Sequence, residues 1–268
     1  MHDATPYWQK DDKGFKKATD LAWNFPEQKQ GTIKIIGGNS STFATEVKVS
    51  EYINHTFPFI KSVQNAFPDA LKSKFPPMEN LEFYESTDSG SFSNSPELWR
   101  ALDNADSGII LGDLSKNSIT AVAISDLIGV CGDIPLVITR DAIDLVTSTA
   151  NDFINRDNLY IVASMASMQK LLRALYYPRP IMLSQPILPV VETLHKFTVS
   201  YPVSILTFHD GKIICAHDGK VATIDIEKTN FTPLSLWSGE LAARLAVFAA
   251  FNRNSSLESM LAAVNYKC

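Results

Sequence analysis

Ser238, Gly239 and Glu240 bring three groups that could do chemistry to one point of the chain, directly after Trp237. A strongly apolar, helix-forming run begins at Leu241. We expect Ser238 to cap that helix and Gly239 to let a ligand approach the backbone. The free N–H groups at the helix start would bind a phosphate or another anion, and the Glu240 carboxylate could move a proton there. The alternative is an ordinary capped helix in which Glu240 only complements the helix dipole.

A second group of candidate residues follows the apolar runs that we expect to be strands. Gly38 and Asn39 follow residues 33–36, Gly112 follows residues 107–111, and Asp141 follows residues 135–139. In open α/β sheets ligands bind beyond the carboxyl ends of the strands, so these residues are candidates for one shared crevice with residues 238–240. The alternatives are a tight turn at Gly38 and a helix-capping role for Asp141. The chain has no dinucleotide fingerprint, P-loop, serine nucleophile elbow or zinc signature.

The elements that must position these residues alternate along the chain. Further strands are expected at 159–162 and 203–207, and helices at 43–55, 60–73, 118–130, 141–147, 165–175 and 188–199. This rhythm predicts an α/β fold with a doubly wound, mostly parallel sheet flanked by helices on both faces. Asp218 and Gly219 predict an antiparallel hairpin at one edge of the sheet. We expect residues 1–30 to be an irregular N-terminal extension, 31–268 to be a single domain and 76–97 to be a long loop.

Composition excludes several functional classes. The 268 residues are 45% hydrophobic with a formal net charge of −5, which argues against nucleic acid as a partner. No apolar run approaches about 18 residues and no secretory segment opens the chain, so we expect neither membrane spanning nor export. The three cysteines are far apart without metal-ligand spacing, so no metal site is expected. Sparse cysteines suit a reducing compartment, and a cytoplasmic location is expected.

From about residue 29 to 265 these motifs resemble, in their order, the ribokinase-like superfamily, and most closely its ADP- or ATP-dependent NAD(P)H-hydrate dehydratases. Residues 34–39 resemble the family's first strand and Gly-Gly-Ser turn, and residues 107–112 resemble the strand before its Gly-Pro-Gly-Leu-Gly loop. Residues 135–144 are similar to its Asp-Ala-Asp-Ala-Leu-Asn segment. Residues 237–243 stand in the place of its Gly-Thr-Gly-Asp-Val-Leu-Ala motif.

The resemblance implies a ribokinase-like fold and a nucleotide-dependent hydro-lyase that removes water from hydrated NADH or NADPH, with ADP or ATP and Mg²⁺ as cofactors. The implied acid/base residue is Glu240. The resemblance further implies an anion or nucleotide site at Trp237, Ser238 and Gly239, and a substrate site at Gly38, Asn39, Gly112 and Asp141. Small-molecule nucleotides are therefore the expected partners, and a homo-oligomer is compatible with the resemblance because relatives often assemble.

The chain also departs from the family at its motifs. Glu240 stands where the family has Asp, and Trp237 replaces the first glycine of the anion hole. Residues 163–168 replace the family's Pro-His-Pro-Gly-Glu segment, and residues 207–209 replace its Lys-Gly pair. These departures leave two further hypotheses open. One is a catalytically degenerate ribokinase-like protein that binds a ligand without turnover, and the other, less favoured, is a small-molecule kinase.

Overall fold

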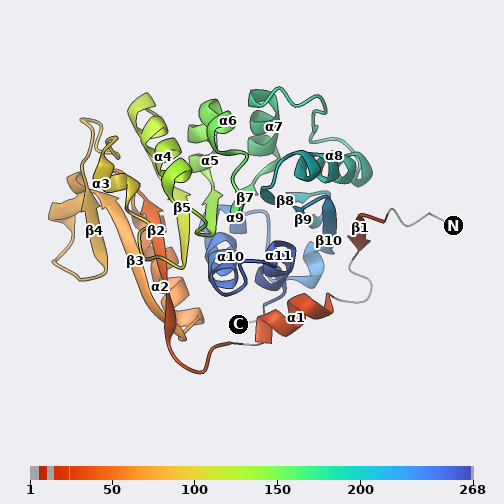
Figure 1. Cartoon of the computed structure of the whole chain (residues 1–268), viewed down its shortest axis with the longest axis horizontal. Coiled ribbons are helices and arrows are strands. Elements are labelled where there is room, and N and C mark those ends of the chain that lie inside the picture. Colours follow the sequence, from red (N-terminus) through yellow and green to blue (C-terminus); the bar gives the residue numbers. More distant parts are fainter. Residues whose placement is uncertain (1–5, 11–14, 24, 267–268) are drawn as a thin grey trace.

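The computed structural model describes residues 6–10, 15–23 and 25–266. Within these ranges the chain forms one ten-stranded sheet in the order β1-β10-β9-β8-β7-β6-β5-β2-β3-β4 (Figure 1). The strands from β8 through β4 in this order pair in parallel, β8, β9 and β10 form an antiparallel meander, and β1 pairs in parallel with β10. The strands are β1 (Trp8–Lys10), β2 (Gln30–Gly37), β3 (Ile60–Pro68), β4 (Leu81–Tyr84), β5 (Ser107–Gly112), β6 (Leu136–Thr139), β7 (Leu159–Ala163), β8 (Ser204–His209), β9 (Lys212–His217) and β10 (Lys220–Asp225).

Helices cover both faces of the sheet (Figure 1). One hydrophobic cluster joins one face to α3 (Pro96–Trp99), α4 (Ser118–Val130), α5 (Asp141–Val146), α6 (Ala150–Phe153), α7 (Met165–Ala174) and α8 (Ile187–Ser200). A second cluster joins the other face to α1 (Lys16–Trp23), α2 (Ala44–Thr56), α9 (Ser235–Ser238), α10 (Glu240–Phe251) and α11 (Ser256–Asn265). Short 3₁₀ helices lie at Asp69–Lys74, Thr147–Thr149 and Ile226–Lys228. The predicted α/β architecture is therefore confirmed.

The central strands β5, β6 and β7 are buried along their whole length, because helices cover both of their faces. This is why they read as near-continuous apolar runs in the sequence. The hairpin between β9 and β10 turns at Asp218 and Gly219, which have φ values of 47° and 69°. Positive φ at both central residues is the geometry of the tight turn that an Asp-Gly pair predicts, so that hairpin is confirmed.

Three local expectations were wrong. Residues 60–73 were expected to be helical, but residues 60–68 form β3, an inner strand between β2 and β4. The apolar residues Ile60, Val63 and Ala66 lie at helical spacing, and pairing with β2 overrides that local pattern. The segment 76–97 contains β4, which pairs with β3 at the edge of the sheet. Residues 1–30 are not irregular throughout, because they contain β1 and α1.

Two absences hold for the described part of the chain. None of its helices combines the length and the apolar character needed to cross a membrane. None of its His, Cys, Asp and Glu side chains gather in groups of three or more that could hold a metal ion. Cys131 and Cys215 are buried free thiols, and Cys268 lies outside the described residues.

Candidate functional site

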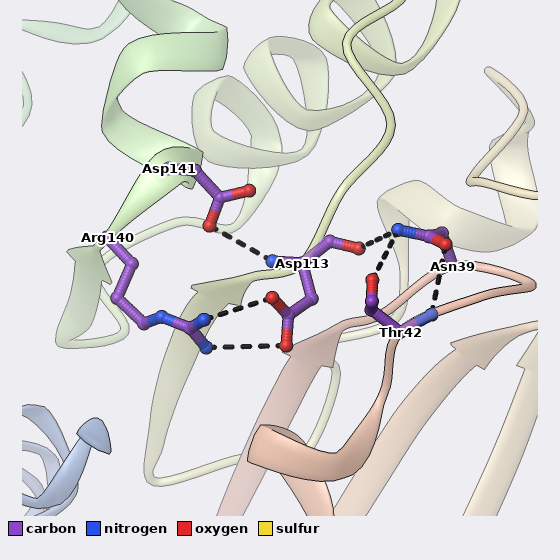
Figure 2. A network of polar contacts seen from close by, with 5 residues as sticks. All are labelled: Asn39, Thr42, Asp113, Arg140 and Asp141. Atoms are coloured by element: carbon purple, nitrogen blue, oxygen red, sulfur yellow. Dashed lines mark hydrogen bonds and ion pairs between the residues drawn. The ribbon is translucent and has the colours of Figure 1, made fainter. Parts of the chain in front are cut away.

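The carboxyl ends of three neighbouring strands, β2, β5 and β6, carry the first half of the candidate site. Gly38 and Asn39 follow β2, Gly112 ends β5 and Asp141 begins α5 after β6. The structure therefore brings together, at the carboxyl ends of neighbouring strands, all four residues that were expected to line the substrate side. Figure 2 shows Asn39 and Asp141 among them. Their role in binding stays a prediction.

Asn39 ties the turn after β2 to the end of β5. Its side-chain amide donates hydrogen bonds to the Asp113 carbonyl and to Thr42 Oγ1, at 2.5 and 2.8 Å. Its Oδ1 accepts from the backbone N–H groups of Ser41 and Thr42, at 2.8 and 3.2 Å. Figure 2 shows how this side chain joins the two loops. In this arrangement Asn39 holds the crevice together, and a ligand would have to compete for its amide.

Asp113 is the central residue of a polar network that joins it to Asn39, Arg140 and Asp141. Its carboxylate forms an ion pair with Arg140 at 3.0 Å, and its backbone N–H donates to Asp141 Oδ1 at 3.1 Å. The side chains of Asp113 and Arg140 are only 18% and 11% exposed, so this pair is largely shielded from solvent screening. A Cβ atom on Gly112 would lie 2.2 Å from Asp141 Oδ1, which explains why a glycine precedes Asp113.

The backbone is strained at the same place. Asp113 has a φ of 53°, and Arg140 has φ 57° and ψ −138°, a region that side-chain-bearing residues rarely adopt. Such conformations cost on the order of 1–3 kcal/mol each and concentrate at functional sites. Two residues with unusual backbone conformations joined by an ion pair therefore support these strand ends as a candidate site, and sequence reasoning had not selected Arg140.

Glu46 is the second residue that sequence reasoning missed. It lies in the first turn of α2, is fully buried, and neither carboxyl oxygen has a hydrogen-bond partner among the described residues. Its pKa is raised from 4.5 to about 8, chiefly by burial and then by the negative charge of Asp113, while the N–H of its own backbone and then Arg140 act in the opposite direction. The spacing in the sequence could have indicated that Glu46 is buried, because it lies on the same face of the helix as the buried residues Val49, Ser50 and Ile53.

The second half of the candidate site is the junction of α9 and α10. Gly239, with φ 78°, is the N-cap of α10 and has no side chain that could cap the helix. The expectation that Ser238 is the N-cap was therefore wrong in position, because Ser238 ends α9, although its hydroxyl binds one N–H group at the start of α10. The Ser238 hydroxyl donates to the Ser235 carbonyl at 3.1 Å and accepts from the Glu240 N–H at 3.3 Å.

The start of α10 lies against the strand that ends at Gly112. A Cβ atom on Gly239 would meet Leu111 Cδ1 at 2.8 Å and Val49 Cγ2 at 2.7 Å, so the junction is wedged between β5 and α2. Glu240 is half-buried there, and the Trp237 side chain is 55% exposed. No hydrogen bond or ion pair among the described residues joins Glu240 to the Asn39–Asp113–Arg140 network, so the two halves are adjacent and separate.

A cavity of about 550 Å³ opens beside Asp141, between the start of α4, α5 and α7. Asn117 caps α4 at its wall, and Lys170 pairs there with Asp144 at 2.5 Å. Its size suits a small organic ligand. The cavity lining includes Asp141 and none of the residues from 237 to 240.

Comparison with known proteins tests the fold. No family model and no curated protein sequence matches the chain. Among solved structures, a ribokinase-like superfamily protein from Enterococcus faecalis V583 superposes with a TM-score of 0.66 at 13% identity, over 98% of this chain and 86% of that one.

Two Bacillus subtilis structures are similar at lower scores. One is an ADP/ATP-dependent NAD(P)H-hydrate dehydratase co-crystallised with ATP/Mg²⁺ and soaked with CoA (TM-score 0.54, 10% identity, 92% of this chain and 84% of that one). The other is a pyridoxal kinase in an ADP complex (TM-score 0.53, 11% identity, 88% and 89%). At these identities the likeness concerns the fold alone. The chain has a ribokinase-like α/β fold.

Proposed function

We propose that this chain is a divergent nucleotide-dependent hydro-lyase that removes water from hydrated NADH or NADPH, with Glu240 as its acid/base residue. The observation that carries the proposal is the position of Glu240: it begins α10, whose N-cap is the glycine Gly239 and whose start lies against the end of β5. A carboxylic acid at that point could protonate a leaving hydroxyl group, and the helix N-terminus would favour the phosphates of a nucleotide.

The solved structures support the choice of ligand. The similar Bacillus subtilis dehydratase was crystallised with ATP/Mg²⁺, and the similar pyridoxal kinase is an ADP complex. We expect Ser238 and Gly239 to face the phosphates and Trp237 to lie beside them. Bound ADP or ATP with Mg²⁺ would supply the driving force for dehydration through its hydrolysis. On the substrate side we expect Gly38, Asn39, Gly112 and Asp141.

The first test is nucleotide binding. A thermal-shift panel with ADP, ATP, AMP, NADH and NADPH, each with and without Mg²⁺, should show stabilisation by ADP or ATP and by a pyridine nucleotide, because ligands that bind only the folded state stabilise it. The absence of any shift would contradict the proposal.

The second test is turnover of NADH hydrate by the Glu240→Gln variant. Loss of the proton donor should lower kcat by about 100-fold or more. Glu258→Gln is the matched control, because Glu258 is also a half-buried acid in the first turn of a helix, at the start of α11. A Glu240→Gln protein as active as the parent would remove Glu240 from the mechanism.

One observation favours a second candidate, a ligand-binding protein without turnover. The cavity beside Asp141 does not include Glu240, so a ligand could be held there without contact with the proposed acid. This candidate predicts neither ADP nor ATP affinity and no NADH-hydrate turnover. Clear stabilisation by either nucleotide would count against it.

A further inference from the structure

Glu46 is a buried acid that the proposed reaction does not use. A Cβ atom on Gly37 would lie 2.4 Å from Glu46 Oε1 and 2.8 Å from the Gly112 carbonyl oxygen. The carboxyl group therefore lies against the backbone of β2, beside the carbonyl at the end of β5. This is the floor of the crevice formed by the strand ends.

Arg140 complements this carboxyl group. Its two terminal nitrogens bind the Asp113 carboxylate at 3.0 and 3.4 Å, whereas its Nε atom is buried and has no hydrogen-bond partner among the described residues. The site thus contains a buried cation, Arg140, whose Nε has no hydrogen-bond partner among the described residues. It also contains a buried carboxyl group, that of Glu46, whose two oxygens have none there either. Buried polar groups of native proteins nearly always have partners, so this pair of unmet groups requires an explanation.

The charges that act on Glu46 come from two neighbouring segments. Asp113 follows β5, and Arg140 and Asp141 follow β6. β2 contributes the uncharged Gly37. From α10, Gly239 meets Val49 and the Arg244 guanidinium binds the Tyr52 hydroxyl, further along α2. Of the groups whose charges act on Glu46, Arg140 is the cation.

We propose that Glu46 is a proton-linked positioning residue: protonated, it leaves Arg140 on Asp113, and ionised, it draws the guanidinium group away and loosens the Asn39–Asp113–Arg140 network. A buried carboxylate without a partner is costly, so ionisation has to be compensated by the nearest available donor. We infer that this donor is the buried Nε of Arg140, because Arg140 is the cation whose charge acts on Glu46 and its Nε has no hydrogen-bond partner among the described residues. The strained backbone of Asp113 and Arg140 can relax when their ion pair opens.

The consequence for ligand binding rests on the proposed function. A phosphate-bearing ligand at the carboxyl ends of these strands would contact the ordered Asn39–Asp113–Arg140 network only while Glu46 is protonated. Ionised Glu46 would both disorder the network and add a negative charge beneath the ligand. The ligand proposed for this side of the site is the pyridine nucleotide, so affinity for NADH should fall as the pH rises from 7 to 9.

The decisive experiment uses the ligand-free full-length protein. The Asp113 amide and Arg140 Nε–H resonances are followed by NMR from pH 6 to 9 in the wild type, in Glu46→Gln and in Glu51→Gln, an exposed acid on the same helix. We expect both resonances to move together with a midpoint near pH 8 in the wild type and in Glu51→Gln, and to stay constant in Glu46→Gln. Constant resonances in the wild type, or an unchanged midpoint in Glu46→Gln, would overturn the proposal.

A second variant keeps the test decisive if Glu46→Gln does not fold. Asp113→Asn removes the negative charge that disfavours Glu46 ionisation, so the Arg140 Nε–H midpoint should move to lower pH. An unmoved midpoint would count against the proposal. NADH titrations at pH 7 and 9 then separate the two proposals. If the resonances titrate as expected and NADH binds at neither pH, the positioning role stands and the proposed function fails.

Discussion

The buried carboxyl group of Glu46 should make the free energy of unfolding depend on pH. Its folded-state pKa of about 8 lies above the ordinary value of 4.5, so between these values the folded state holds a proton that the unfolded state has released. The contribution of Glu46 to stability is therefore fully present below about pH 4.5 and is lost as the pH rises toward 8, by up to about 1.4 kcal/mol per pH unit.

The measurement is urea unfolding at pH 5, 6, 7 and 8 for the wild type and Glu46→Gln. The variant keeps the shape of the neutral acid but cannot ionise, so its free energy of unfolding should rise relative to the wild type as the pH increases. Glu51→Gln, on the exposed side of α2, should follow the wild type. A difference between Glu46→Gln and wild type that is independent of pH would show that Glu46 ionises freely in the folded protein.

Single residues also show where prediction from sequence stops. The turn residues Gly38 and Gly112 could be placed at strand ends because apolar runs stop before them. Glu46 and Arg140 could not be assigned to the site from local pattern alone. The burial of Glu46 depends on a glycine of another element, and the strain at Arg140 depends on Asp113, which is 27 positions away in sequence.

At the scale of elements, the junction of α9 and α10 depends on a glycine. Gly239→Ala places a side chain at φ 78° and sets its Cβ against Leu111 and Val49, at 2.8 and 2.7 Å. The backbone strain should cost about 1–2 kcal/mol, and the clash with packed side chains about 1–3 kcal/mol more. The free energy of unfolding, measured with urea, should fall by the sum of the two costs.

Gly132→Ala is the control for Gly239→Ala. Gly132 has a similar φ of 62°, but a Cβ atom there would have nothing within 4 Å. This variant should therefore show the strain cost alone. Equal losses for the two variants would mean that the start of α10 can move away from β5 and α2 without penalty.

Elements differ in how well their sequences predict them. The strands β5, β6 and β7 were predictable because both of their faces are buried, which leaves a continuous apolar run. The strand β3 was not predictable, because its apolar residues lie at helical spacing. The polar residues Ser62, Gln64 and the buried Asn65 stand between them. Only its pairing with β2 and β4 makes it a strand, and pairing is not visible in a local window.

At the scale of the whole molecule, one sheet separates two hydrophobic clusters and contributes side chains to both. Because β2, β3 and β5 to β10 contribute side chains to both clusters, neither cluster can lose its packing while the other keeps it. We expect residues 31–268 to unfold as one unit, with coincident far-UV and near-UV transitions in urea. Two separated transitions would contradict the single-domain prediction.

The N-terminal strand β1 forms one edge of this sheet and pairs with β10. It pairs in parallel with β10 over Trp8–Lys10, the Trp8 indole donates to Thr223 Oγ1 at 3.0 Å, and the Tyr7 ring stacks on His195 at 3.8 Å. Deleting residues 1–10 would leave the backbone groups of β10 without this partner and expose a strand edge. The truncated protein should melt at a lower temperature and should aggregate more readily.

Amide hydrogen exchange shows which strands are destabilised by the deletion of residues 1–10. Amides of β10 should exchange faster in the truncated protein, whereas those of β5, β6 and β7 should keep their protection because β10, β9 and β8 still stand between them and the open edge. Trp8→Phe is the control, since it removes only the indole bond to Thr223 and leaves the backbone pairing intact. If β10 exchanges equally fast in both variants, the indole contact rather than strand pairing holds β1 in place. If neither variant changes exchange, β10 is protected without β1, and the N-terminal strand is dispensable for the stability of the sheet.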